Sequence, residues 1–160
     1  MNLIPIGIIH SPHQRAQGTP VQAALATGVR GTVEIFPEYV EGLRDLDGFE
    51  RIWLVYWFDR AKPAELVVTP YLDATPRGLF VTRAPCRPNP IGFSPVRLVE
   101  IMGRILQVDG LDILDNTPLL DIKPYIPEFD AFEAKRIGWC AGVQGGGTVA
   151  DGRFEARSPG

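Results

Sequence analysis

Glycine and proline occur so often along this chain that it cannot be built mainly from long helices. There are 17 glycines and 15 prolines among the 160 residues, one residue in five, against about 12% in average proteins. Both residues mark turns and end helices. The chain is therefore predicted to consist of many short elements joined by tight turns, an organisation that favours β structure.

Short apolar runs predict about seven strands and few helices. The most hydrophobic run, 52–58, is rich in aromatic and β-branched residues and fits a strand buried on both faces. Within 105–114, Asp109-Gly110 between two apolar runs predicts a type I′ hairpin. These strands predict a mainly β (all-β) fold, a single small closed β-barrel with short helices and no Rossmann fold. The remaining expected strands are 3–9, 31–36, 66–69, 79–82 and 96–101.

Helices are expected only in short pieces, and the end of the chain is expected to lie outside the barrel. One helix opens at Pro37, and a second is predicted over 130–138 with Asp130 as its cap. The last residues are rich in glycine, which predicts a flexible tail. Length and pattern thus indicate one barrel domain over 1–141, followed by a tail over 142–160.

Composition argues against several kinds of site and location. The two cysteines, Cys86 and Cys140, have no partner at zinc-ligand spacing, so we expect free thiols and no metal site. The start of the chain lacks the basic segment of a signal peptide. No apolar run approaches the roughly 20 residues of a membrane span. We therefore expect a cytoplasmic protein that does not enter a membrane.

Charge is distributed unevenly, and the net charge is −3. Residues 1–33 and 74–99 contain no Asp or Glu, and the second of these segments carries four arginines. If the two segments meet in space, they form a local positive surface on an acidic body. The other interpretation is that both are unrelated solvated loops. The net negative charge argues against a protein that coats nucleic acid.

The segment 82–94, TRAPCRPNPIGFS, carries three prolines in six residues. Proline denies the backbone helical and ladder hydrogen bonds, so a rigid extended loop is predicted. The loop presents Arg83, Arg87 and Asn89, and the planar fork of arginine suits carboxylates and phosphates. The pattern fits either a binding loop or a structural turn stiffened by proline.

The segment 114–127, LDNTPLLDIKPYIP, begins with turn residues. Asp121 and Lys123 are two positions apart, so on an extended segment they share one face. They form either a surface ion pair worth at most about 1 kcal/mol, or an acid and a base that hold a hydroxyl and a carboxylate of a ligand.

Together these two segments resemble the paired signature of the TsaA-like (TrmO) family of tRNA methyltransferases. Further stretches extend the resemblance over about residues 3–140: IGIIHSP, a P-x-Q at 20–22, PEYVEGL and FERIWLVYWFDR. The resemblance implies a β-barrel homodimer that transfers a methyl group from S-adenosylmethionine to N6 of a threonylcarbamoylated adenosine beside the tRNA anticodon. The glycine-rich loop of Rossmann folds is absent, which without the resemblance argues against this cofactor.

The resemblance also implies which residues contact the cofactor. We expect Arg83 or Lys123 to bind the methionine carboxylate, and Asp121 to bind a ribose hydroxyl or the amino group. Phe93 and Leu120 are expected to face the adenine. By family position the whole set is Ala23, Ala24, Leu25, Asp59, Arg60, Arg83, Phe93, Leu120, Asp121, Ile122 and Lys123.

Methyl transfer from a sulfonium is a direct displacement, so alignment of the two reactants is the main contribution of such an enzyme. The acceptor nitrogen of a ureido group has a delocalised lone pair, and removal of its proton assists the attack. Asp121 and Tyr125 are the candidate catalytic bases.

Three positions depart from the family pattern: Val21 where arginine is frequent, Asn116 where glycine is frequent, and Asp59 where histidine is common. The chain is also not expected to carry the additional C-terminal domain of longer members. These departures weaken the assignment of tRNA more than that of the cofactor. Two alternatives stay open: methylation of a small molecule, or binding of S-adenosylmethionine or RNA without catalysis.

Overall fold

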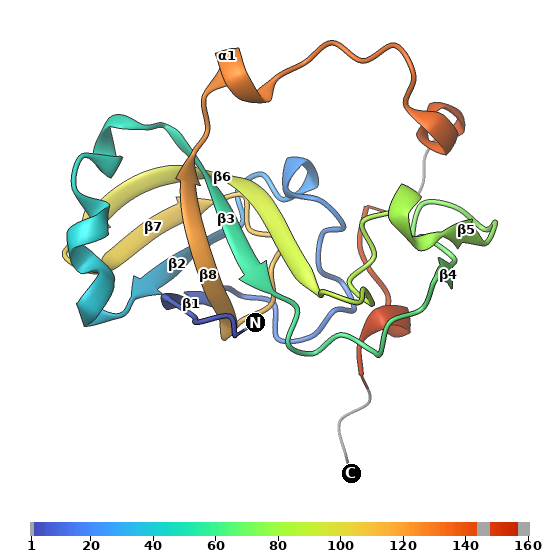
Figure 1. Ribbon diagram of the computed structural model, residues 1–160, viewed down its shortest axis with the longest axis horizontal. Coiled ribbons are helices and arrows are strands. Elements are labelled where there is room, and N and C mark those ends of the chain that lie inside the picture. Colours follow the sequence, from blue (N-terminus) through green and yellow to red (C-terminus); the bar gives the residue numbers. More distant parts are fainter. Residues whose placement is uncertain (1, 144–147, 157–160) are drawn as a thin grey trace.

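Six antiparallel strands close into a barrel in the computed structural model of the chain, which describes residues 2–143 and 148–156 (Figure 1). The prediction of a mainly β fold built on one small closed barrel is confirmed. Around the barrel the strands follow the order β1 (Gly7–His10), β2 (Arg30–Ile35), β7 (Ile105–Asp109), β6 (Ile91–Met102), β3 (Arg51–Trp57) and β8 (Thr117–Pro124), and β8 pairs with β1 to close it.

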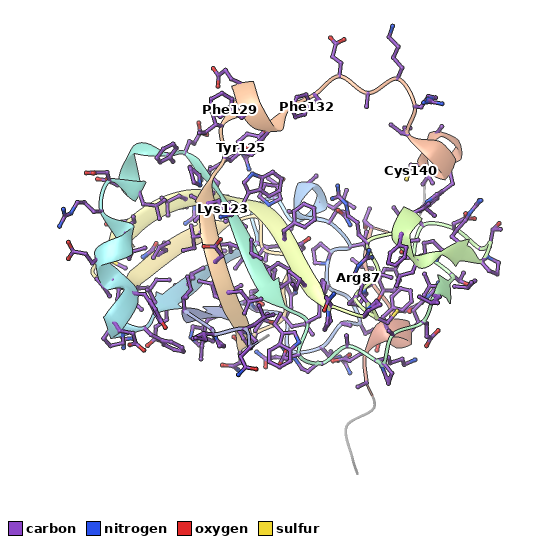
Figure 2. All side chains as sticks on the ribbon, in the orientation of Figure 1. Arg87, Lys123, Tyr125, Phe129, Phe132 and Cys140 are labelled. Atoms are coloured by element: carbon purple, nitrogen blue, oxygen red, sulfur yellow. The ribbon has the colours of Figure 1, made fainter. Side chains whose placement is uncertain are left out.

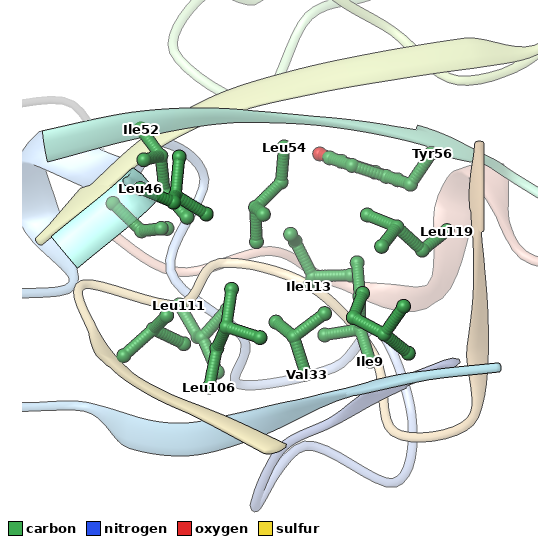
Figure 3. Close-up of a cluster of buried hydrophobic side chains, with 13 residues drawn as sticks. Ile9, Val33, Leu46, Ile52, Leu54, Tyr56, Leu106, Leu111, Ile113 and Leu119 are labelled. Atoms are coloured by element: carbon green, nitrogen blue, oxygen red, sulfur yellow. The ribbon is translucent and has the colours of Figure 1, made fainter. Parts of the chain in front are cut away.

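Aliphatic side chains that alternate along the strands fill the barrel interior. Ile9, Val33, Leu54 and Leu106 have no exposed surface, and Figure 3 shows them meeting from different walls. Burial of one such side chain contributes about 1.5–3 kcal/mol. This shared core, formed by residues far apart in the sequence, holds the strands together.

The outer face of β3 is not buried, contrary to the prediction for 52–58. Leu54 and Tyr56 point into the barrel, whereas Trp53 is only half-buried and Trp57 is exposed on the other face. A closed barrel has a single interior, so only one face of each strand is buried within it. The aromatic side chains of the outer face therefore have another role.

Helical residues occur only as short turns. The helix expected at Pro37 is present as a 3₁₀ helix that begins at that proline. The strand expected over 79–82 is instead a 3₁₀ turn, because the Thr82 amide bonds back to the Leu79 carbonyl at 3.0 Å. The helical segments are Ala23–Leu25, Pro37–Leu43, Leu46–Gly48, Leu79–Val81, Gly138–Gly142 and Gly152–Phe154 (all 3₁₀), and α1 (Pro127–Asp130).

The predicted hairpin at Asp109-Gly110 is wrong. The tight turn between β6 and β7 lies at Gly103, whose φ of 60° suits glycine. Gly110 also has a positive φ of 95°, but its amide bonds to the Val29 carbonyl at 3.0 Å and the chain does not fold back. It continues across the barrel to form β8, between β1 and β3.

The helix predicted over 130–138 is also wrong. Helix α1 begins at Pro127 and ends at Asp130, the residue expected to start the helix. The Asp130 carboxylate accepts hydrogen bonds from the Ile126 amide at 2.8 Å and from Trp53 Nε1 at 3.2 Å, so it fastens this turn to β3. Residues 127–138 are all exposed and form an arch that rises from β8 (Figure 1).

A small lobe, residues 61–88 and 148–156, lies beside one end of the barrel (Figure 1). It contains the two-stranded sheet of β4 (Val67–Val68) and β5 (Arg77–Gly78). Its apolar cluster is separate from the barrel core and consists of Val68, Leu79, Ala84, Cys86 and Phe154.

Phe154 belongs to the segment that was predicted to be a flexible tail. Of that segment, 144–147 and 157–160 lie outside the described residues. The stretch 148–156 packs against the fold: Val149 forms an isolated bridge with Pro20, and Glu155 forms one with Ala61. Phe154 is only 6% exposed. Burial of this aromatic ring therefore holds the stretch 148–156 in place, despite the flexibility expected from its glycine-rich composition.

Candidate functional site

A pocket of about 340 Å³ opens between the end of the barrel and the small lobe. A volume of this order suits a ligand of nucleoside size. Strand ends and loops that are distant in sequence meet there because the barrel and the small lobe converge. The walls come mainly from five segments: 16–22, 56–61, 82–94, 112–117 and 150–155.

The buried side of the pocket, its floor, carries a chain of three polar side chains. The Tyr56 hydroxyl lies 3.1 Å from Ser94 Oγ, which in turn donates to Asp112 Oδ1 at 2.7 Å. Tyr56 and Ser94 are 3% and 2% exposed. The Tyr56 ring lies over Gly92, its partner on β6. This arrangement requires glycine at position 92, because a side chain there would clash with the Tyr56 ring.

Burial raises the pKa of both titratable groups in this chain. For Asp112 burial outweighs the opposing effects of the Ser94 hydrogen bond, the backbone amides and the charge of Arg83. For Tyr56 burial and the Asp112 carboxylate act in the same direction. At neutral pH Tyr56 therefore keeps its proton, and Asp112 is a stronger base than a surface carboxylate.

Arg83 lies at the mouth of the pocket. Its Nη1 donates to Gln22 Oε1 at 2.6 Å, and its guanidinium lies 5.6 Å from the centroid of the Phe93 ring. The bond to Gln22 joins the two segments that lack acidic residues, so of the two interpretations given above, the one in which these segments meet is correct. Asp112 and Glu155 from other segments also line this pocket, and the site therefore has mixed charge.

The proline loop presents its three polar residues in different ways. Arg83 points to the pocket mouth, whereas Arg87 folds back and donates to the Thr82 carbonyl at 3.1 Å. Its guanidinium lies over Phe80, at 5.7 Å. Asn89 is exposed and does not line the pocket. The loop thus combines an arginine at the pocket mouth with an arginine that bonds to the loop backbone itself.

Asp59 and Arg60 extend from the end of β3 into the pocket wall. Arg60 Nη2 donates to the Asp115 carbonyl at 2.7 Å and to Thr117 Oγ1 at 3.0 Å, which fixes the turn before β8. Arg60 Nε lies 3.5 Å from an Asp59 oxygen, and within the described residues this buried atom has no hydrogen-bond partner. Arg60 thus holds the pocket wall together through its Nη2 bonds and its pairing with Asp59.

Ala23, Ala24 and Leu25 form the 3₁₀ turn that follows Gln22. They do not line the pocket, but the backbone of Ala23 favours the ionised form of Asp112. Leu25 is 47% exposed. This turn therefore borders the site from behind its floor.

The other predicted residues lie on β8, outside the pocket. Lys123 Nζ and Asp121 Oδ2 form an ion pair of 2.8 Å, so the prediction that they share a face is confirmed. Both side chains are exposed, 66% and 46%, and pairing with Asp121 raises the pKa of Lys123. Leu120 lies at a β-bulge opposite β3, and Ile122 packs partly against the barrel core.

An aromatic ladder, Tyr125, Trp53 and Phe93, connects this part of β8 with the pocket mouth. The centroids of Tyr125 and Trp53 are 5.6 Å apart, and those of Trp53 and Phe93 are 5.5 Å apart. Figure 2 shows Tyr125 and Lys123 at the foot of the arch, with Phe129 and Phe132 on the arch itself. Through Phe93 and Arg83 the outer face and the pocket form one continuous surface.

The structure also brings residues to the site that sequence reasoning missed. Tyr56 was interpreted as part of a core strand, Ser94 was given no role although it ends the segment 82–94, and Asp112 carried no motif. The available signal was the place of Ser94 at the end of the proline-rich segment, although the structure puts it within β6 and not in a loop. Nothing in the sequence indicated that the C-terminal residues Ala150, Phe154 and Glu155 line the pocket.

Two features are absent from the part of the chain that the structure describes. Within it no three His, Cys, Asp or Glu side chains lie close enough together to hold a metal ion. In the same residues no helix has the length and apolar character needed to cross a bilayer.

Comparison with known proteins matches residues 8–131 to a family model described as the tRNA-methyltransferase O N-terminal domain. A Pyrococcus abyssi protein named as a "probable S-adenosyl-L-methionine-binding protein" is 58% identical over 135 residues, which are 84% of this chain and 73% of that protein. The Escherichia coli K12 tRNA (adenine(37)-N6)-methyltransferase is 35% identical over 132 residues, which are 76% of this chain and 56% of the enzyme.

The fold is similar to a crystal structure of TrmO from Pseudomonas aeruginosa. The two agree with a TM-score of 0.73 and 38% identity, over 87% of this chain and 62% of that chain. This chain therefore spans less than two thirds of the length of the Escherichia coli enzyme and of the Pseudomonas aeruginosa TrmO chain. The matched family model includes the barrel and the proline loop but ends before residues 148–156, which line one side of the pocket.

Proposed function

This chain belongs to the tRNA-methyltransferase O family, and on that basis we propose that it is an S-adenosylmethionine-dependent methyltransferase. Its proposed methyl acceptor is N6 of threonylcarbamoyladenosine beside the anticodon of tRNA. We propose that this methyl transfer takes place in the cytoplasm. Relatives named as S-adenosyl-L-methionine-binding proteins support the cofactor. The name of the Escherichia coli enzyme supports the tRNA acceptor.

The position of Arg83 is the observation that carries the proposal. S-adenosylmethionine offers a carboxylate, an ammonium group, a sulfonium and an adenosine, so its site needs a cation, acidic groups and flat apolar surfaces. Arg83 supplies the cation at the mouth of the pocket, where its guanidinium lies over the Phe93 ring. Charge-assisted hydrogen bonds from arginine to a carboxylate are strong.

The rest of the ligand fits the aromatic ladder and β8. The rings of Trp53 and Phe93 offer π faces to an adenine or a sulfonium. Asp121 and Lys123, on the outer face beside them, are placed to bind ribose hydroxyls and the amino-acid end. When bound, the cofactor supplies an electrophilic methyl group, and the residues of this chain orient the acceptor toward it and exclude water.

The tRNA acceptor is supported by the arginines of the small lobe and the proline loop. Arg83 and Arg87 line the pocket, and Arg77 lies nearby in β5, over the ring of Trp139 at 5.8 Å. Phosphate contacts made by such residues position RNA without reading its sequence. The pocket would then receive the modified base.

We also propose that two copies of the chain form a homodimer through the outer face of the barrel and the arch. Trp57, Phe93, Phe129 and Phe132 are 42%, 52%, 70% and 83% exposed. Large exposed apolar side chains that gather on one face are typical of a surface that binds another protein. A second copy covering the aromatic ladder would also enclose a cofactor bound there.

The proposal is tested by transfer of a radiolabelled methyl group from S-adenosylmethionine. The acceptors are tRNA from cells that lack this methylation, tRNA from cells that also lack threonylcarbamoylation, and a small-metabolite extract. Label only in the first tRNA supports the proposed acceptor. Label only in the extract supports a small-molecule methyltransferase, which the size of the pocket also permits. Bound cofactor with no label in any acceptor supports a non-catalytic binding module.

A further inference from the structure

One carboxyl group of the pocket has no part in the cofactor contacts proposed above. Asp112 lines the pocket and is held by Ser94, whose Oγ donates to Asp112 Oδ1 at 2.7 Å. Because the single hydroxyl hydrogen of Ser94 is used in this bond, the Tyr56 hydroxyl must donate to Ser94 Oγ across 3.1 Å. The three groups therefore form a chain with one direction, from Tyr56 through Ser94 to Asp112.

The surroundings of Asp112 make this carboxylate a base of raised strength. The groups that face it are Ser94, Tyr56, the backbone of Ala23 and the guanidinium of Arg83. Burial outweighs the stabilising groups and raises the pKa of Asp112. A general base works best when its pKa lies near the working pH, and burial is one way in which enzymes achieve this. The other charged residues of the pocket are Asp59, Arg60, Arg87 and Glu155.

We propose that Asp112 is the general base that removes the proton from the acceptor nitrogen, with Ser94 and Tyr56 as positioning residues. This inference rests on the proposed methyltransferase function and assigns one further role within the same site. As the N–H bond breaks, the proton passes to Asp112 and the nitrogen lone pair forms the new N–C bond. The C–S bond breaks with its electron pair moving to sulfur, which changes from a sulfonium to a neutral thioether.

The geometry favours Asp112 over the two bases expected from the sequence. Asp121 is exposed on β8 and already forms a 2.8 Å ion pair with Lys123. Tyr125 stacks on Trp53 in the aromatic ladder. Neither residue lines the pocket, whereas Asp112 does. An acceptor that enters the pocket can therefore contact Asp112 but neither of these two residues.

The test compares Asp112→Asn and Ser94→Ala with the wild-type full chain in methyl transfer to threonylcarbamoylated tRNA. We expect Asp112→Asn to lower kcat about 100-fold or more, with Kd for S-adenosylmethionine and KM for tRNA changed less than about threefold. Asp47→Asn, on an exposed turn far from the pocket, is the matched control and should keep wild-type kinetics.

The pH profile separates a positioning role of Ser94 from a merely structural one. The Ser94 bond lowers the pKa of Asp112, so in Ser94→Ala the acid limb of kcat/KM should move to higher pH. Carbon-13 NMR of labelled aspartate gives a readout that requires neither cofactor nor acceptor. One carboxyl should titrate above the ordinary range, be absent from Asp112→Asn and titrate still higher in Ser94→Ala.

Each result bears on one proposal or on both. Methyl transfer by Asp112→Asn at the wild-type rate, or an Asp112 carboxyl that titrates in the ordinary range, overturns the role of Asp112 and leaves the methyltransferase proposal intact. If the acid limb of the kcat/KM profile does not move in Ser94→Ala, the role of Asp112 is likewise overturned and the methyltransferase proposal is left intact. A wild-type protein that labels no acceptor overturns the proposed function and this inference together.

Discussion

The guanidinium of Arg83 lies over the ring of Phe93, 5.6 Å from its centroid. Arg83 comes from the proline loop and Phe93 from the start of β6, and both line the pocket where it meets the aromatic ladder. On its other side Arg83 bonds to the neutral amide of Gln22. Because neither neighbour neutralises the guanidinium, its charge remains available to an anionic ligand.

Removal of this charge should weaken cofactor binding. Hydrogen bonds to charged groups contribute about 1.5–3 kcal/mol, so Arg83→Ala should raise the Kd for S-adenosylmethionine about 10- to 100-fold in isothermal titration calorimetry. Arg104→Ala, at the far β6–β7 turn where Arg104 pairs with Glu34, removes the same charge and should leave the Kd unchanged. Equal affinities for the two variants would exclude Arg83 from the cofactor site.

The closed barrel was predictable because apolar alternation reports directly which side chains face a common core. Val33, Leu54 and Leu106 alternate with polar or half-exposed neighbours in this way. Short signals were less reliable. Asp109-Gly110 has the composition of a hairpin turn, but tertiary pairing of β7 with β2 and β6 determines where the chain goes next.

The candidate site was only partly predictable, for a physical reason. Arg83 and Asp59 lie in segments with a recognisable pattern, and the structure places both at the pocket. Tyr56 lies in an apolar run, where a tyrosine indicates core packing. Asp112 becomes informative only when Ser94, 18 positions earlier, is known to bond to it. Such a contact depends on strand register, which a single sequence does not specify.

The arch should be required for dimer formation. Phe129 and Phe132 are 70% and 83% exposed, so their replacement removes apolar surface without opening a cavity. We expect the double variant Phe129→Ser, Phe132→Ser to be monomeric in light scattering at concentrations where the wild type is a dimer. Phe80→Ser removes a comparably exposed phenylalanine, 76%, from the small lobe and should stay dimeric. A monomeric wild type would contradict the proposed homodimer.

The C-terminal stretch should contribute to stability. Phe154 is 6% exposed and packs with Cys86 and Leu79 in the small-lobe cluster. Phe154→Ala should lower the free energy of unfolding by about 3 kcal/mol, as large-to-small substitutions of buried phenylalanine do. Val149→Ala in the same stretch, where Val149 is 50% exposed, should cost less than about 1 kcal/mol. Urea denaturation measures both, and similar losses would indicate that Phe154 is not anchored as described.

Gly31 is needed where β1, β2 and the chain after β7 approach each other. A methyl group at this position would clash with the backbone carbonyl of His10 and with the Leu111 side chain. We expect Gly31→Ala to lower the free energy of unfolding by about 2 kcal/mol or more, because overpacking forces the backbone to shift. Gly42→Ala, where a methyl group would meet no atom within 4 Å, should change it by less than about 0.5 kcal/mol. Thermal unfolding that ranks the two variants equally would contradict the close approach.

Asp112 should make the free energy of unfolding decrease as the pH rises, whereas an ion-paired aspartate makes it increase. Burial raises the pKa of Asp112 in the folded protein, so the unfolded chain releases this proton first as the pH rises. The stabilising contribution of the protonated group is complete below the ordinary aspartate pKa and is lost as the pH rises through the folded value. Asp112→Asn cannot ionise and should therefore gain stability relative to the wild type over that range.

Asp73 provides the comparison of opposite sign. The Thr75 amide and the Arg77 side chain hold the pKa of Asp73 below its usual range, so its contribution is present above the ordinary pKa and is lost as the pH falls. Asp73→Asn should thus lose stability relative to the wild type as the pH rises. Urea unfolding from pH 3 to 8 measures both differences. If Asp112→Asn follows the Asp73→Asn curve, the pocket carboxylate is not the buried base described above. If it rises while Asp73→Asn falls, the protein maintains an ionised carboxylate in its pocket at a cost to its own stability, as is expected of a functional group.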